Sequence, residues 1–167
     1  MVTSAQLPLQ EYLETSYEPE CEYVDGELIP KAMGAKDHAR LQFHIGRLLY
    51  RYEQQGLCEV ATELSVQVRG TVVLIPDVCL LRPGSGEHGV VREPALLCIE
   101  VLSPSDRFSY TVKKCGEYIA WGVPACWIFD PIEKKAWFYD AEGLHPVVRD
   151  GVLRVESIEL PLTELWP

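Results

Sequence analysis

The sequence predicts an α/β (α+β) fold in which a central mixed β-sheet is flanked by helices. Two segments carry apolar residues at helical spacing, several short runs are apolar or alternate with the period of a strand, and turn-forming residues separate them. A chain of 167 residues, 47% hydrophobic and 24% charged, is large enough to bury a proper core. We therefore expect one globular domain over residues 1–167.

The N-terminal half predicts a short helix, a hairpin, a long helix and two consecutive strands. The pair Asp25-Gly26 within "CEYVDGELIP" is typical of a hairpin turn. Gly56 ends the apolar stripe of the long helix, and Gly70 ends a stretch of clean alternation. The expected bounds are residues 7–16 and 35–55 for the helices, 21–30 for the hairpin, and 58–70 and 72–81 for the two strands.

The C-terminal half predicts a loop, a buried strand, a second long helix and further strands. Residues 82–94 are rich in Gly, Pro and charge, which indicates a loop. Pro94 and Pro104 bound a short apolar run that is typical of a buried strand. A helix begins near residue 108 and ends at "WGVP". The strands "ACWIFDP", "KKAWFYD" and "VVRDGVLRV" follow, with Asp150-Gly151 as a tight turn.

Charge and composition exclude several classes of protein. The formal net charge of −10 argues against a protein that coats nucleic acid by bulk electrostatics, so a contact with nucleic acid must be local. No run approaches the roughly 18 apolar residues that a bilayer span needs, and the N-terminus lacks the features of a signal peptide. We expect a cytoplasmic protein without a membrane partner. The scattered cysteines predict reduced core thiols: Cys21, Cys58, Cys79, Cys98, Cys115 and Cys126.

Two acidic residues interrupt apolar strands. Glu100 lies in "ALLCIEVL", and Asp77 lies in "VVLIPDVCLL" at a Pro76-Asp77 step where we expect the sheet to fray. A buried, ionised carboxylate is costly unless it is paired or binds a metal. Two of them on consecutive strands suit Mg²⁺ or Mn²⁺, which prefer oxygen ligands. The alternative is that each acid caps a strand end, pairs with a lysine or faces solvent.

Two lysines on the second long helix could complete such a site. Lys113 and Lys114 flank the expected inner face on opposite sides, and periodicity alone does not choose between them. Lys114 shares its flank with Arg107, Thr111 and Tyr118, a polar set that could line a cleft. Both lysines could equally face solvent. The inner face itself is expected to consist of Phe108, Val112, Cys115 and Ile119.

Five motifs in this order resemble the successive motifs of the Uma-two family: "EYVDGEL", "PDV", "IEVLSPSD", "KKCGEY" and "WGVPACWIFDP". A helix that begins with His38 follows the first motif and belongs to the same resemblance. The match runs from Glu22 to Asp130. Members of this family are predicted restriction endonucleases within the PD-(D/E)XK nuclease superfamily. The resemblance implies a restriction-endonuclease-like fold and a metal-dependent nuclease that hydrolyses phosphodiester bonds, with DNA as the expected substrate.

The resemblance also implies the catalytic residues. Asp77 matches the aspartate of the PD motif, and Glu100 matches the acid of the next strand. These two carboxylates and the backbone carbonyl of Val101 are the expected ligands of Mg²⁺ or Mn²⁺. Leu102 departs from the pattern, because a lysine is expected there. In this family the lysine moves to the next helix, and a lysine four residues before a tyrosine selects Lys114.

Three further residues are expected to support the site. Tyr118 is the tyrosine that accompanies Lys114, and Glu22 matches a further acid before "DGE". His38 lies on the apolar side of its helix. A buried, hydrogen-bonded His38 that closes the site and a catalytic His38 are both compatible with the pattern.

The first long helix offers a basic sector for nucleic acid. Lys36, Arg40, Arg47 and Arg51 fall within one narrow sector that no acid interrupts. An ordinary solvated helix face explains the same pattern. We expect a homodimer, because two-fold symmetry serves the cutting of two strands. The alternative function is a catalytically degenerate member of the fold that binds a metal or a partner.

Overall fold

The structure is a computed structural model that describes residues 6–32, 34–86 and 89–166. Its helices are α1 (Leu9–Glu14), α2 (Lys36–Glu53), α3 (Phe108–Trp121) and α4 (Leu162–Leu165). The N-terminal strands are β1 (Cys21–Val24), β2 (Glu27–Pro30), β3 (Glu59–Thr62), β4 (Val66–Arg69), β5 (Val72–Leu74) and β6 (Val78–Leu81). The remaining strands are β7 (Leu97–Val101), β8 (Cys126–Asp130), β9 (Lys135–Asp140), β10 (Gly143–Val147), β11 (Val152–Val155) and β12 (Ile158–Pro161).

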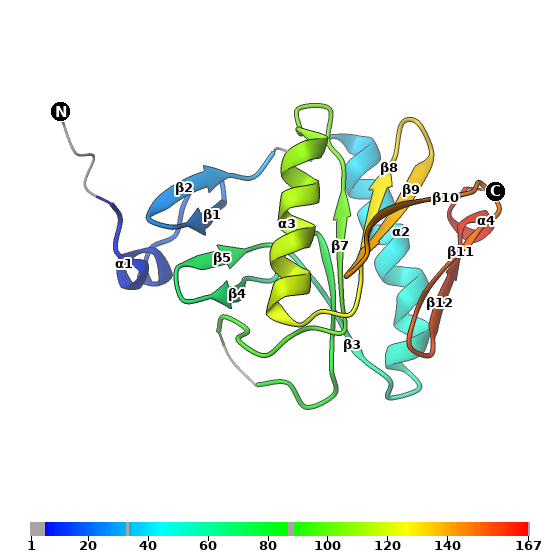
Figure 1. The fold of residues 1–167 in the computed structure, drawn as a ribbon, viewed down its shortest axis with the longest axis horizontal. Helices are drawn as coiled ribbons and strands as arrows, with labels where there is room; N and C mark the ends of the chain where they lie inside the picture. Colours follow the sequence, from blue (N-terminus) through cyan, green and yellow to red (C-terminus); the bar gives the residue numbers. More distant parts are fainter. Residues whose placement is uncertain (1–5, 33, 87–88, 167) are drawn as a thin grey trace.

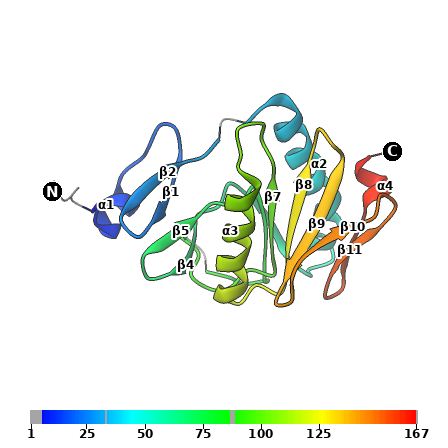
Figure 2. The same cartoon turned by 45° about the horizontal axis from the view of Figure 1, so that its top comes forward.

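A six-stranded sheet with the order β10-β9-β8-β7-β6-β3 forms the centre of the molecule. It is mixed, because β7 and β8 are parallel while its other pairs are antiparallel. A four-stranded sheet, β2-β1-β5-β4, lies with α1 toward one end of the molecule, and the β11-β12 hairpin and α4 lie at the other end (Figures 1 and 2). The predicted architecture, a central mixed sheet flanked by helices, is confirmed.

The two long helices cover opposite faces of the central sheet. Side chains along a strand alternate between faces, and the core divides accordingly. Ile99 packs in the cluster of α2, whereas its neighbour Cys98 packs in the cluster of α3. Glu100 lies two residues from Cys98, so its side chain points toward α3. This register brings a strand carboxylate to the inner face of a helix.

The prediction of one strand over residues 58–70 was wrong. Glu63 has a positive φ of 51° and separates β3 from β4. The two pieces belong to different sheets, because β3 pairs with β6 while β4 pairs with β5. The next predicted strand, over residues 72–81, is divided in the same way into β5 and β6. The interruption contains Asp77, at the Pro76-Asp77 step where fraying was expected.

The C-terminal strands also differ from the prediction. Residues 148–151 do form a turn, in which the Gly151 N–H donates to the Val148 carbonyl at 2.8 Å. The strands on its two sides do not pair with each other, because β10 pairs with β9 and β11 pairs with β12. Strand β12 and helix α4 were not predicted.

The inner face of α3 is rotated from the predicted one. Its buried residues are Thr111, Lys114, Cys115 and Tyr118, while Phe108, Val112 and Ile119 are only partly buried. Three residues expected on a flank, Thr111, Lys114 and Tyr118, are therefore buried. All six cysteines are described, buried and free, as predicted. Among the described residues, no helix is long and apolar enough to cross a membrane.

Candidate active site

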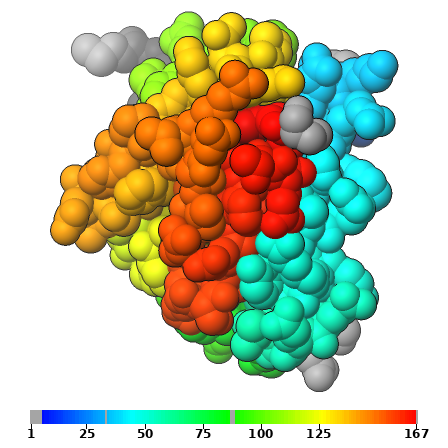
Figure 3. Space-filling model, turned by 90° about the vertical axis from the view of Figure 1, so that its right-hand side faces the viewer, coloured from blue at the N-terminus to red at the C-terminus, as the bar shows by residue number. Residues whose placement is uncertain are grey.

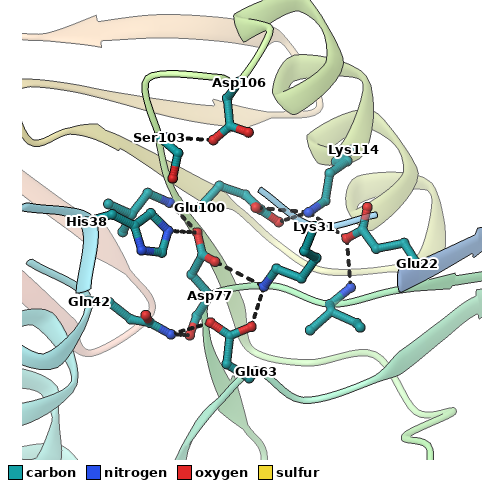
Figure 4. A network of polar contacts seen from close by, with 12 residues as sticks. Glu22, Lys31, His38, Gln42, Glu63, Asp77, Glu100, Ser103, Asp106 and Lys114 are labelled. Carbon is teal, nitrogen blue, oxygen red and sulfur yellow. Dashed lines mark hydrogen bonds and ion pairs between the residues drawn. The ribbon is translucent and has the colours of Figure 1, made fainter. Parts of the chain in front are cut away.

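The two acids that interrupt apolar strands lie side by side in the structure. Strands β6 and β7 are antiparallel, with Val78 opposite Ile99. Asp77, just before β6, therefore lies beside the end of β7. The backbone N–H of Val101 donates to Asp77 Oδ2 at 2.7 Å (Figure 4). Adjacent strands thus bring Asp77 and Glu100 together as the sequence predicted.

The Asp77 carboxylate is buried, with 3% of the residue exposed, and it has three charged or polar partners. Oδ2 accepts the Val101 N–H and lies 3.3 Å from His38 Nε2, while Oδ1 lies 3.1 Å from Lys31 Nζ. Burial alone would raise the pKa of Asp77, but the His38 hydrogen bond, the Lys31 ammonium and the Val101 N–H lower it to about 2. Asp77 is therefore ionised at neutral pH.

Glu100 is surrounded differently, although it is nearly as buried. Both of its oxygens lie 2.9 Å from Lys114 Nζ, and the Tyr118 hydroxyl donates to Oε1 at 2.8 Å. Burial raises the pKa of Glu100 to about 7; the charge of Asp77 adds to this effect, and Lys114 opposes it. The two neighbouring carboxyl groups thus differ strongly in their affinity for a proton.

Glu22 and Lys114 complete the buried part of the site. Lys114 Nζ lies 2.6 Å from Glu22 Oε1, which also accepts the Ile75 N–H at 2.9 Å. The Tyr110 hydroxyl donates to Glu22 Oε2 at 3.0 Å. Burial would lower the pKa of Lys114, but Glu100 and Glu22 together raise it well above its usual range. Lys114 is therefore an ammonium held between two carboxylates.

The predicted supporting residues all lie at the site, and both expected roles of His38 stay predictions. It is buried on α2 and positions Asp77, and the Asp77 carboxylate raises its pKa despite the opposing effect of burial. Val101 contributes its N–H, a role that the sequence did not suggest. The expected use of its carbonyl as a metal ligand stays a prediction.

Four residues of the site were not predicted: Lys31, Gln42, Glu63 and Tyr110. Lys31 pairs with both Asp77 and Glu63. Gln42 Nε2 donates to Glu63 Oε1 at 2.6 Å and to the Asp77 carbonyl at 2.8 Å. Tyr110 lies one helical turn before Lys114, and this four-residue spacing is a signal that could have identified it. Lys31 and Glu63 lie at irregular positions, where no periodicity marks them.

A cavity of about 610 Å³ opens onto these groups, with Asp77, Glu100 and Lys114 among its lining residues. Ser103 also lines it, and its buried Oγ has no hydrogen-bond partner among the described residues. The carboxylates of Glu22, Asp77 and Glu100 are all buried. The carboxylate oxygens and the Ser103 hydroxyl are the kind of oxygen ligands that a hydrated, hard divalent cation prefers.

A second group of possible metal ligands lies elsewhere. Asp140, Glu142 and His145 have ligand atoms within 4.8 Å of one another in the β9–β10 hairpin. Asp140 Oδ1 accepts the Glu142 N–H at 2.9 Å and lies 3.2 Å from His145 Nε2. An aspartate that accepts a backbone N–H two residues ahead is a common turn-stabilising arrangement. These contacts explain why the three side chains lie close together: they stabilise the hairpin turn.

The basic sector of α2 is partly retained. Lys36, Arg40 and Arg47 line a shallow hollow of about 580 Å³. Burial lowers the pKa of His44 on the same helix, and Arg47 and Arg40 lower it further, which indicates a locally positive field. Arg51 has a different role: its Nη1 lies 2.8 Å from Glu164 Oε2. This pair joins α2 to the C-terminal helix α4, whose surfaces (cyan and red) adjoin in Figure 3.

The fold and the site place the chain in the restriction-endonuclease-like class. A crystal structure described as "a putative nuclease belonging to DUF820" from Anabaena variabilis matches with a TM-score of 0.85. The match covers 96% of this chain and 97% of the other, at 22% sequence identity. The model of the Uma2 (Uma-two) family, described as "Putative restriction endonuclease", matches residues 9–165, so the chain belongs to this family. No curated protein matches it.

Proposed function

We propose that the chain is a divalent-cation-dependent nuclease that hydrolyses phosphodiester bonds in DNA. The observation that carries the proposal is the meeting of Asp77, Glu100 and Lys114 in one cavity of a restriction-endonuclease-like fold. Proteins of this fold generally use a divalent metal. The oxygen donors of Asp77 and Glu100 fit Mg²⁺ or Mn²⁺, and the Val101 carbonyl is the proposed third ligand. When bound, the cation would offset negative charge on a phosphate oxygen and acidify a water molecule.

The chain's own residues prepare the site for that chemistry. The Val101 N–H and His38 fix the orientation of Asp77, and Tyr118 fixes one oxygen of Glu100. Buried residues with fixed rotamers hold their polar groups in place without reorganising during a reaction. The site is thus organised before any ligand arrives.

Lys114 has the properties of an electrostatic group rather than a base. Because its pKa is raised well above the usual range, its side chain keeps its proton at neutral pH and cannot accept one from water. An ammonium beside Glu100 can orient a water molecule or offset the charge that develops on a phosphate in the transition state. We assign this role to Lys114.

The proposed binding of nucleic acid rests on exposed basic side chains of α2. Lys36, Arg40 and Arg47 are exposed along α2 and line one hollow, which gives a phosphate chain a positively charged surface to bind. Arg51 leaves the proposed binding set, because Glu164 already occupies its guanidinium. Local positive charge of this kind allows an acidic protein to bind nucleic acid.

A nuclease assay on duplex DNA, single-stranded DNA and RNA tests the proposal. We expect cleavage of DNA with Mg²⁺ or Mn²⁺, none with chelator, and none by Asp77→Asn. Cleavage that persists in chelator would contradict it. A degenerate, cation-binding protein is the second candidate, favoured by the net charge of −10 and by the neutralisation of Asp77 by Lys31. Cation binding without cleavage of any substrate would support that candidate. The homodimer stays a prediction.

A further inference from the structure

Lys31 is the residue of the site that neither the sequence nor the family comparison pointed to. It follows β2, where its backbone N–H donates to the Glu20 carbonyl at 2.9 Å. Its ammonium reaches back into the cavity and lies 3.1 Å from Asp77 Oδ1 (Figure 4). The positively charged side chain of Lys31 thus contacts the carboxylate that we propose as a metal ligand.

The two oxygens of Asp77 are not equivalent. Oδ2 accepts the Val101 N–H and contacts His38, both from rigid elements that position the carboxylate. Oδ1 is the oxygen that remains for a cation, and Lys31 is its partner. An ammonium and a divalent cation at the same oxygen repel each other and compete for the same lone pairs. Binding of a metal at Oδ1 therefore requires Lys31 to move.

Lys31 is better placed to move than the other lysine of the site. The Lys114 side chain is 7% exposed and is clamped by both Glu22 and Glu100. The Lys31 side chain is 15% exposed, and one of its two carboxylate partners is Glu63, which is itself more exposed. Gln42 holds Glu63 in place independently of Lys31. If the Lys31 ammonium leaves Asp77, it can stay paired with Glu63. The movement therefore breaks only one of its two ion pairs.

We propose that Lys31 is a tethered cation that occupies the metal position at Asp77 in the metal-free protein and sets the affinity for the divalent ion by competing with it. This inference rests on the proposed function, because it takes Asp77 as a metal ligand. A competing internal cation lowers the apparent metal affinity by the free energy of its own contact. It also protects the fold, because it neutralises Asp77 when metal is absent.

The test is calorimetric titration of metal-free protein with MnCl₂ alone. Lys31→Met keeps the length of the stem and removes the charge, so we expect Mn²⁺ to bind about tenfold more tightly, as for the loss of one competing ion pair. The melting temperature in chelator should change in the opposite direction: Lys31→Met should melt at a lower temperature than the wild type. Lys135→Gln removes one charge from an exposed lysine and should match the wild type in both measurements.

The outcomes separate this inference from the proposed function. Asp77→Asn should abolish the Mn²⁺ signal; if it binds as the wild type does, or if the wild type does not bind, the proposed metal site fails and the inference with it. If Asp77→Asn loses binding but Lys31→Met binds with unchanged or weaker affinity, the metal site stands and Lys31 does not compete.

A measurement on the wild type covers the case in which Lys31→Met does not fold. Acetylation of lysines, followed by mass spectrometry, reports how accessible each ammonium is. Saturating Mn²⁺ should raise the labelling rate of Lys31 several-fold, because displacement from Asp77 removes the more buried of its two ion pairs, while Lys135 stays constant. An unchanged rate at Lys31 under saturation would overturn the proposal.

Discussion

The pH dependence of stability should reveal the buried charge of Glu100. Burial raises the pKa of this carboxyl from its ordinary 4.5 to about 7. The substitution Glu100→Gln keeps the shape of the side chain and removes its ionisation. Its amide oxygen can still accept from Tyr118 and Lys114, which contact the carboxylate in the wild type. The comparison therefore isolates the cost of ionising Glu100 in the metal-free protein.

The sign follows from the direction of the shift. A carboxyl whose pKa is higher in the folded state binds its proton more tightly there, so its stabilising effect is complete below about pH 4.5 and is lost as the pH rises through about 7. The gap between the two pKa values corresponds to about 3 kcal/mol of unfolding free energy. His38, whose pKa is raised above its ordinary 6.5, loses its contribution as the pH rises beyond that value. Its effect is present in both proteins and largely cancels in the difference.

Urea unfolding with chelator, from about pH 5.5 to about pH 8.5, measures this difference. The wild type should lose about 2 kcal/mol relative to Glu100→Gln across this range, because part of the effect is already lost between about pH 4.5 and about pH 5.5. Glu133→Gln serves as the control, because it makes the same change in net charge at an exposed site and should run parallel to the wild type. Parallel profiles for the wild type and Glu100→Gln would refute the reasoning, since Glu100 would then be ionised throughout.

The same pair of proteins tests the role of Glu100 as a ligand. Binding of Mn²⁺ stabilises the folded protein by an amount that grows with the logarithm of the free Mn²⁺ concentration divided by Kd. We expect a large rise in melting temperature for the wild type and a smaller one for Glu100→Gln, so that their order at neutral pH reverses when chelator is replaced by Mn²⁺. Equal shifts in both proteins would mean that Glu100 is not a ligand.

Two further predictions concern cleavage and binding. Asp77→Ala and Lys114→Ala should abolish metal-dependent cleavage without unfolding the protein, while Lys113→Ala, an exposed residue, should be much milder; equal loss at both lysines in a nuclease assay would contradict the assignment. Replacing Arg40 and Arg47 with Gln should lower the slope of log affinity against log salt by about two, since each phosphate contact contributes about one. An unchanged slope would make this face an ordinary solvated surface.

The elements that were predicted correctly are those with a local signal. Helix α2 follows from its apolar stripe, and the first hairpin follows from Asp25-Gly26. The strands that were predicted wrongly depend on distant partners. Alternation runs without interruption from residue 58 to 70, yet the chain breaks at Glu63 because the two halves join different sheets. No local pattern records which sheet will accept a strand, so this division could not be read from the sequence.

The site divides in the same way. Asp77 and Glu100 were predictable because a charge inside an apolar strand is conspicuous and needs a partner. Lys114 was chosen by family resemblance, because the apolar residues of α3 suggested a different inner face. Lys31 had no signal at all: its role depends on a segment without regular structure that returns to the site beside β6. Contacts of that kind are defined only by the folded chain.

The position of the proposed catalytic lysine follows from the register of β7. Positions 100 and 102 alternate onto the same face of the sheet, and α3 covers that face. In this chain Leu102 joins the apolar cluster beneath α3. The helix supplies the ammonium instead, because Lys114 points inward and meets Glu100 from the side that residue 102 would have used. This placement requires a lysine on the buried face of a helix, which Glu22 makes tolerable by providing a second buried carboxylate. The buried polar residues that interrupt the apolar periodicity of α3, Lys114 and Tyr118, are thus the ones that form the site.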